Sequence, residues 1–128
     1  MNELLELKIA QFERALATLK NGLRPEPNDL EIDGAIQRFE YCFELAWKVL
    51  KIRLEQIGIT GISSPKAAIQ KGFIAGVVTD EDEWLMMLDD RNLTVHTYDE
   101  KTACEIFQRL SGHLSAFGML LDHIKRDL

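Results

Sequence analysis

The residues best suited to chemistry in this chain lie close together. Arg91, Asn92, His96 and Tyr98 supply a guanidinium, an amide, an imidazole and a phenol within one short segment. A histidine changes its charge near neutral pH and can move a proton. An arginine can hold phosphate oxygens in a fork and stabilise added negative charge. These residue types suit chemistry on a phosphate, with Asn92 available to orient the histidine or to bind a ribose hydroxyl.

The spacing of these residues limits how they can act together. In a regular α-helix Asn92 and His96 share one face, whereas Arg91 and His96 point about 140° apart around the axis. Arg91 and His96 can therefore meet one ligand only if the helix ends or distorts nearby, or if two chains meet. The alternative interpretation is structural: Asp89 or Asp90 pairs with Arg91, the imidazole caps a helix C-terminus, and the phenol packs.

Three long series of apolar residues indicate the helices that must position this segment. Each series alternates steps of three and four, which keeps its side chains on one helix face. The series are Leu5, Ile9, Phe12, Leu16, Leu19 and Leu23; then Ile32, Ile36, Phe39, Phe43, Trp47, Leu50, Leu54 and Ile57; then Ala103, Phe107, Leu110, Leu114, Phe117, Leu121, Ile124 and Leu128. Such lengths predict helices packed nearly parallel or antiparallel.

Residues that start and stop helices mark the boundaries between these elements. Prolines cannot continue a helix, and glycines favour its end. Gly22, Pro25 and Pro27 end the first helix, a capping box at Asn28 and Glu31 opens the second, and Gly58 ends it. An N-cap at Ser64–Pro65 opens a third helix that runs to about Phe73, and the acidic residues at 79–83 start a fourth helix that includes Val95. Thr97 with Glu100, or Asp99 alone, caps the last helix. The sequence therefore predicts an all-α, up-and-down helical bundle of four to five helices, forming one domain over residues 1–128.

Composition restricts the class of protein. With 46% hydrophobic residues and 28% charged residues the chain can form a core of its own. It has no apolar run near the roughly 20 residues that span a bilayer, and its acidic, polar start is unlike a signal peptide, so we expect a cytoplasmic protein without a membrane partner. The net charge of −6 argues against nucleic-acid binding through the overall field, so any such contact must be local. We expect Cys42 and Cys104 to be reduced, half-buried thiols.

The remaining polar residues give weaker signals. Glu44 and Lys48 are four residues apart, in the orientation that favours an ion pair on a helix surface. His113 and His123 lie in the last predicted helix without carboxylate or cysteine partners at ligand spacing, so neither is assigned to a site. No metal site is predicted.

Several stretches together resemble one known family. Arg91 to Tyr98 resembles the R-x4-H motif of HEPN domains (named for higher eukaryotes and prokaryotes nucleotide-binding), in the R-x4-H-x-Y form of HepT toxins. Residues 38–48, RFEYCFELAWK, resemble a signature of the nucleotidyltransferase substrate-binding proteins, as do Ser64–Pro65–Lys66, Gly72–Phe73 and residues 84–92. The resemblance covers roughly residues 5 to 125.

This resemblance implies a fold, partners and roles that the spacing alone does not give. It implies a bundle of about five helices that forms a homodimer, with Arg91 and His96 lining a cleft between the subunits. Arg91 and His96 would cleave RNA without a metal, with Asn92 supporting RNA or nucleotide binding. A minimal nucleotidyltransferase would use ATP to place a nucleotide on Tyr98 and silence the toxin, so this chain needs no cofactor of its own.

Two alternatives stay open. In the first, the chain is a non-catalytic subunit that binds nucleotide or substrate for a nucleotidyltransferase. In the second, it is a structural dimerisation bundle, and the segment from Arg91 to Tyr98 is an ordinary helix end. RNA cleavage by the chain alone would favour the ribonuclease over the substrate-binding subunit. A cleft at His96 would favour it over the structural bundle.

Overall fold

The computed structural model describes residues 2–127, and their regular structure is entirely helical. In chain order the elements are α1 (Glu3–Gly22), α2 (Asp29–Gln56), α3 (Pro65–Ile74), α4 (Glu81–Leu93), the 3₁₀ turn η1 (Thr94–His96) and α5 (Glu100–Arg126). The predicted all-α bundle is confirmed. Leu128, the last member of the third apolar series, lies outside the described residues.

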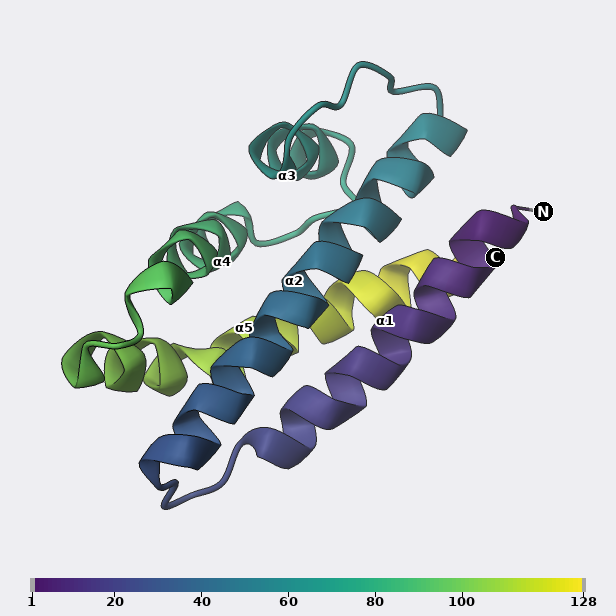
Figure 1. Ribbon diagram of the computed structural model, residues 1–128. Coiled ribbons are helices and arrows are strands. Elements are labelled where there is room, and N and C mark those ends of the chain that lie inside the picture. Colours follow the sequence, from purple (N-terminus) through teal and green to yellow (C-terminus); the bar gives the residue numbers. More distant parts are fainter. Residues whose placement is uncertain (1, 128) are drawn as a thin grey trace.

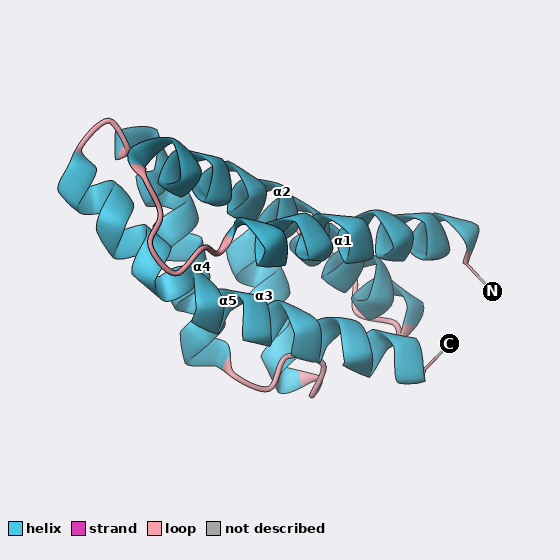
Figure 2. Ribbon diagram, turned by 90° about the horizontal axis from the view of Figure 1, so that it is seen from below, coloured by secondary structure: helices cyan, strands magenta, loops and turns pink. Residues whose placement is uncertain are grey.

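Helix α2 is the centre of the arrangement. It packs against α1, α3, α4 and α5, while α5 also packs against α1 and α4. Figure 1 shows α1 and α2 side by side, with α5 crossing behind them and the shorter α3 and α4 on the other side of α2. In Figure 2 the loops are short links at the ends of the helices, and both chain ends lie at one end of the bundle. No helix within residues 2–127 is long and apolar enough to cross a membrane.

The helices begin where their capping residues predict. Asn28 and Glu31 form the full capping box of α2, each side chain bonding the other residue's backbone N–H. Ser64 caps α3, with Pro65 at the first helical position. Of the two proposed caps for α5, Asp99 is the one used, because its carboxylate accepts from the backbone N–H of Lys101. These caps satisfy backbone donors that have no partner inside the helix.

The first two apolar series form the core largely as predicted, and the third is only half right. The buried residues of α5 are Ala103, Ile106, Leu110, His113, Ala116, Phe117, Leu120 and Ile124. Phe107, Leu114 and Leu121 pack beside them and are only partly buried. The prediction that the fourth helix includes Val95 is wrong, because α4 ends at Leu93; the side chain of Val95 is 72% exposed.

The two cysteines differ in a way that the sequence does not show. Neither is half-buried as predicted: Cys42 lies fully in the core and Cys104 is exposed. Burial raises the pKa of the Cys42 thiol to about 12, because the thiolate would lose its hydration. Cys42 therefore packs as a small apolar side chain.

Candidate functional site

Arg91 contacts two residues of α2, Phe43 and Glu44. Its Nη2 lies 2.6 Å from Oε1 of Glu44, and its guanidinium carbon lies 5.7 Å from the centre of the Phe43 ring. The other carboxylate oxygen of Glu44 accepts a hydrogen bond from Nε1 of Trp47 at 3.2 Å. The predicted alternative partners of these charges are wrong: Arg91 pairs with neither neighbouring aspartate, and Glu44 pairs with Arg91 instead of Lys48. The arginine and its carboxylate are about one-third exposed, so the guanidinium still reaches the surface.

The helix that carries Arg91 ends two residues later. Leu93 is the last residue of α4, and Thr94–His96 continue as a 3₁₀ turn. The hydroxyl of Thr94 donates to the backbone carbonyl of Arg91 at 2.7 Å, and that of Thr97 donates to the carbonyl of Thr94 at 3.1 Å. These bonds satisfy carbonyls at the end of the helix. The helix thus ends between Arg91 and His96, which is one of the conditions under which the two residues could meet one ligand.

His96 and Tyr98 form a second pair at this helix end. Nδ1 of His96 lies 3.2 Å from the Tyr98 hydroxyl, and the two rings meet edge to face at 5.9 Å between centres. Tyr98 is 82% exposed, and His96 and Asn92 are also exposed. Within residues 2–127 no hydrogen bond or ion pair joins Arg91 to His96. One chain thus presents the cation and the imidazole–phenol pair separately.

A hollow of about 210 Å³ opens beside Tyr98. It lies where the starts of α2 and α5 approach the end of η1. Its lining residues are Asp29, Ile32, Asp33, Thr97, Tyr98, Glu100, Ala103 and Cys104. The phenol therefore borders a surface depression that carries carboxylates and has space for a small group.

A buried polar cluster between α4 and α5 was not predicted from the sequence. Nδ1 of His113 lies 2.5 Å from Oε2 of Glu83, and its Nε2 lies 2.6 Å from Oδ2 of Asp90. Arg109 binds both oxygens of Asp90, with its Nε 2.9 Å from Oδ2 and its Nη2 2.6 Å from Oδ1. His113 is fully buried and stacks on Phe39 at 5.3 Å between ring centres. The expectation that His113 lacks carboxylate partners is wrong, because those partners come from another helix.

The charges within this cluster compensate one another. Each nitrogen of the His113 imidazole lies within hydrogen-bond distance of a carboxylate oxygen, one from Glu83 and one from Asp90. Burial would raise the pKa of Asp90, but hydrogen bonds from His113 and Arg109, together with their positive charges, hold that pKa below its ordinary value. The hydrogen bond to Asp90 in turn raises the pKa of Arg109. Asp90 is thus held by two side chains of α5, His113 and Arg109.

The cluster also bears on the site, because Asp90 and Arg91 are neighbours in α4. Asp90 binds α5 through Arg109 and His113, and Arg91 binds α2 through Glu44. The last turn of α4 is therefore held from two sides. This arrangement limits how far Arg91 can shift relative to the rest of the bundle.

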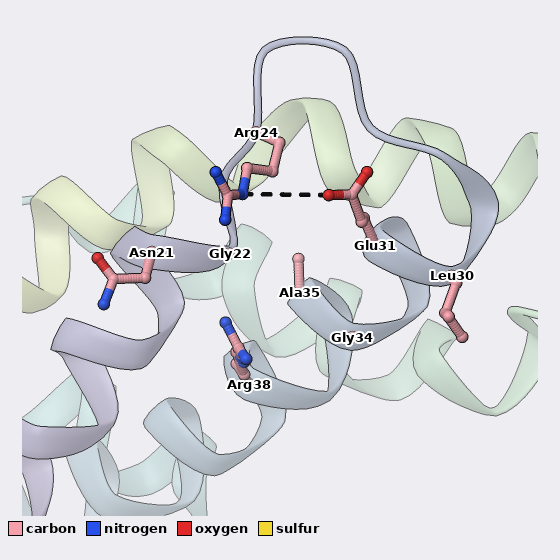
Figure 3. Close-up of a pocket in the computed structure, with 8 residues that line it drawn as sticks. All are labelled: Asn21, Gly22, Arg24, Leu30, Glu31, Gly34, Ala35 and Arg38. Atoms are coloured by element: carbon pink, nitrogen blue, oxygen red, sulfur yellow. Dashed lines mark ion pairs between the residues drawn. The ribbon is translucent and has the colours of Figure 1, made fainter.

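A second hollow, of about 250 Å³, lies between the end of α1 and the start of α2 (Figure 3). Arg38, from the RFE part of the α2 signature, is one of its lining residues. Its Nη1 donates to the backbone carbonyl of Thr18 at 2.9 Å. Arg24 and Glu31 approach to 4.0 Å across the upper side of the same hollow in Figure 3. Arg38 thus satisfies a carbonyl near the end of α1, which is a structural role.

Residues 2–127 contain no group of three or more histidine, cysteine or acidic side chains arranged to hold a metal ion.

Comparison with known proteins identifies relatives along nearly the whole chain. Residues 7–126 match the family described as nucleotidyltransferase substrate binding protein like. A curated relative, the probable ribonuclease HepT of Haemophilus influenzae, is 31% identical over 102 residues, which cover 77% of this chain and 70% of that protein.

Several solved structures share the fold, and two of them illustrate the range of identity. A protein from Thermus thermophilus is 43% identical with a TM-score of 0.82, over 87% of this chain and 96% of that one. A Shewanella oneidensis HEPN toxin, tri-AMPylated and in complex with an MNT antitoxin, is 20% identical with a TM-score of 0.77, over 98% of this chain and 99% of that one. At that identity, the second likeness shows the fold alone.

Proposed function

Because the chain belongs to the nucleotidyltransferase substrate-binding protein family and is a homologue of a HepT ribonuclease, we propose that it is the ribonuclease toxin of a toxin–antitoxin pair. Its partner is a minimal nucleotidyltransferase that uses ATP to place a nucleotide on Tyr98. The chain itself requires no cofactor. The Shewanella toxin, which is AMPylated and bound to an MNT antitoxin, is the precedent for this pairing.

The observation that carries the proposal is the pairing of His96 with Tyr98 at an exposed helix end. The hydroxyl of Tyr98 is 3.2 Å from Nδ1 of His96. A nucleotide on that oxygen would occupy the space next to the imidazole and bring a phosphate against it. Modification of Tyr98 would therefore block His96 directly, which explains how one chemical event could silence the enzyme.

The chemistry assigned to the site is cleavage of the RNA backbone through its own 2′-hydroxyl. The 2′-oxygen attacks the neighbouring phosphorus, and the bond to the 5′-oxygen breaks. His96 removes the proton from the 2′-hydroxyl or gives one to the leaving oxygen, and Arg91 stabilises the charge on the phosphate. Asn92, exposed one turn before His96, supports binding of the RNA. None of these steps needs a metal ion.

A homodimer completes this site in the proposal. A single chain offers Arg91 and His96 without a contact between them, so a second copy can supply the missing group across an interface. Apolar side chains on the outer side of α4 and η1 support such an interface, since Met86, Leu93 and Val95 are 45%, 39% and 72% exposed. Two facing arginines would also concentrate positive charge on an acidic chain.

The test is cleavage of RNA by the purified chain in the presence of EDTA. His96→Ala is expected to lower the cleavage rate by about 10²-fold or more, the usual contribution of a general acid or base. His123→Ala is the matched control, because His123 lies on α5 and its ion-pair partner in the described part of the chain is Asp127, at 3.6 Å. Cleavage by His96→Ala at the rate of the unmodified chain would show that the catalytic assignment is wrong.

A second candidate is the non-catalytic subunit that binds nucleotide or substrate for the nucleotidyltransferase. The ion pair between Arg91 and Glu44 favours it, because the guanidinium is already neutralised by a carboxylate 2.6 Å away. This function predicts a stable complex with the nucleotidyltransferase and no RNA cleavage by the chain in any assembly state. A nucleotide bound to the chain would then be released chemically unchanged when the chain is denatured.

A further inference from the structure

We propose that His96 has a second catalytic role, as the base that takes the proton from Tyr98 when the nucleotide is transferred to it. This inference rests on the proposed function, which makes Tyr98 the acceptor. One imidazole would then serve both the RNA cleavage and the reaction that ends it.

The geometry places a base where the acceptor needs one. A phenol is a weak nucleophile until its proton is removed, and the base must lie within hydrogen-bond reach. The Tyr98 oxygen is 3.2 Å from Nδ1 of His96. A neutral imidazole that carries its proton on Nε2 presents Nδ1 as the acceptor, so the hydroxyl of Tyr98 donates to it. Both rings are exposed, and a partner enzyme can reach them.

The other possible bases near Tyr98 are less well placed. Asp29, Asp33 and Glu100 line the adjoining hollow. Within residues 2–127 none of these carboxylates forms a hydrogen bond with the phenol, whose hydrogen-bond partner is the imidazole. The hollow of about 210 Å³ instead provides space beside Tyr98.

Transfer to Tyr98 exchanges one phosphorus–oxygen bond for another. The Tyr98 oxygen attacks the α-phosphorus of a nucleoside triphosphate and forms an O–P bond. The bond from that phosphorus to the bridging oxygen breaks, and pyrophosphate leaves with the electron pair. The proton of the hydroxyl passes to Nδ1 of His96. The product places a negative phosphodiester beside a positive imidazolium, so the blocked state is stabilised by their attraction.

The experiment measures transfer from α-³²P-labelled ATP by the nucleotidyltransferase partner, with the labelled residue located by mass spectrometry. His96→Ala is expected to slow labelling of Tyr98 by about 10²-fold, and added imidazole is expected to restore part of the rate. His123→Ala is expected to react at the rate of the unmodified chain, and so is Glu100→Gln if no carboxylate of the hollow acts as the base. Circular dichroism confirms that each variant is folded.

The outcomes separate this inference from the proposed function. Labelling of Tyr98 at an unchanged rate in His96→Ala overturns the base role and leaves Tyr98 as the acceptor. Slow labelling that imidazole does not restore also overturns proton transfer by His96. A chain that is never labelled at Tyr98 by an active partner overturns both proposals.

Discussion

Replacing His113 with leucine should weaken the fold strongly, although His113 lies apart from Arg91 and His96. Leucine has nearly the volume of the imidazole but cannot donate a hydrogen bond. In His113→Leu, Asp90 stays buried, with 4% of its side chain exposed, and keeps only Arg109 as a partner. Glu83 is 25% exposed, so it can turn toward solvent. The main loss therefore falls on one buried carboxylate.

The size of this loss follows from the contacts. Removing one partner of a buried ion pair typically costs about 3–5 kcal/mol. Asp90 retains two contacts from Arg109, at 2.9 and 2.6 Å, so the lower end of that range, about 3 kcal/mol, is expected. A chain of 128 residues has an unfolding entropy of about 270 cal/mol/K at the usual value per residue. The melting temperature should therefore fall by about 11 °C.

Thermal and urea denaturation at pH 7 measure this effect. The matched control is His123→Leu on the same helix, which should change the free energy of unfolding by about 0.5 kcal/mol or less because His123 is partly exposed and its contact with Asp127 is long, at 3.6 Å. A loss below about 1 kcal/mol in His113→Leu, or a gain, would refute the reasoning. Leucine packing would then compensate for the ion network, as it can when a whole network is replaced.

Three further outcomes follow from the same structure. Folding lowers the pKa of Asp90, so its contribution to stability is present above the unfolded pKa of about 3.9 and is lost as the pH falls toward the folded pKa. The Asp90→Asn variant should therefore be less stable than the unmodified chain at pH 7, and its stability should decline less steeply below about pH 4 in an acid titration. A thiol reagent at pH 8 should label Cys104 at once and Cys42 only after denaturation, and two fast equivalents in the native chain would contradict the burial of Cys42. Glu44→Gln removes a negative charge next to Arg91 and should lower the KM for RNA about 1.5- to 5-fold in steady-state cleavage, whereas an unchanged KM would show that Glu44 does not compete with phosphate.

The helical architecture could be predicted from local patterns because those patterns cause it. Asn28 and Ser64 satisfy backbone donors next to them in sequence, so their roles do not depend on distant residues. The steps of three and four in α1 and α2 likewise reflect which side of each helix faces the core. Local chemistry thus decided where most helices begin and which side they bury.

The contacts of polar residues could not be predicted in this way. His113 interrupts the apolar line of α5 at a position that must be buried, and this is the one signal that sequence reasoning could have used. Its partners, Glu83 and Asp90, lie 30 and 23 residues away on another helix. Arg91 pairs with Glu44, 47 residues away, and not with the adjacent aspartates, because Asp90 faces α5 and Arg91 faces α2.

Two of the stretches that carry the family resemblance are in contact in the folded chain. Phe43, Glu44 and Trp47 belong to the α2 signature, and all three contribute to holding Arg91 of the second motif. The guanidinium of Arg91 is thereby positioned by α2, and its backbone is held by the bonds of Asp90 to α5. A substitution in either neighbouring helix should therefore change the position of the Arg91 guanidinium without altering the contact between His96 and Tyr98. The position of Arg91 therefore depends on packing against α2 and α5, whereas the positions of His96 and Tyr98 depend on the helix end that follows Arg91.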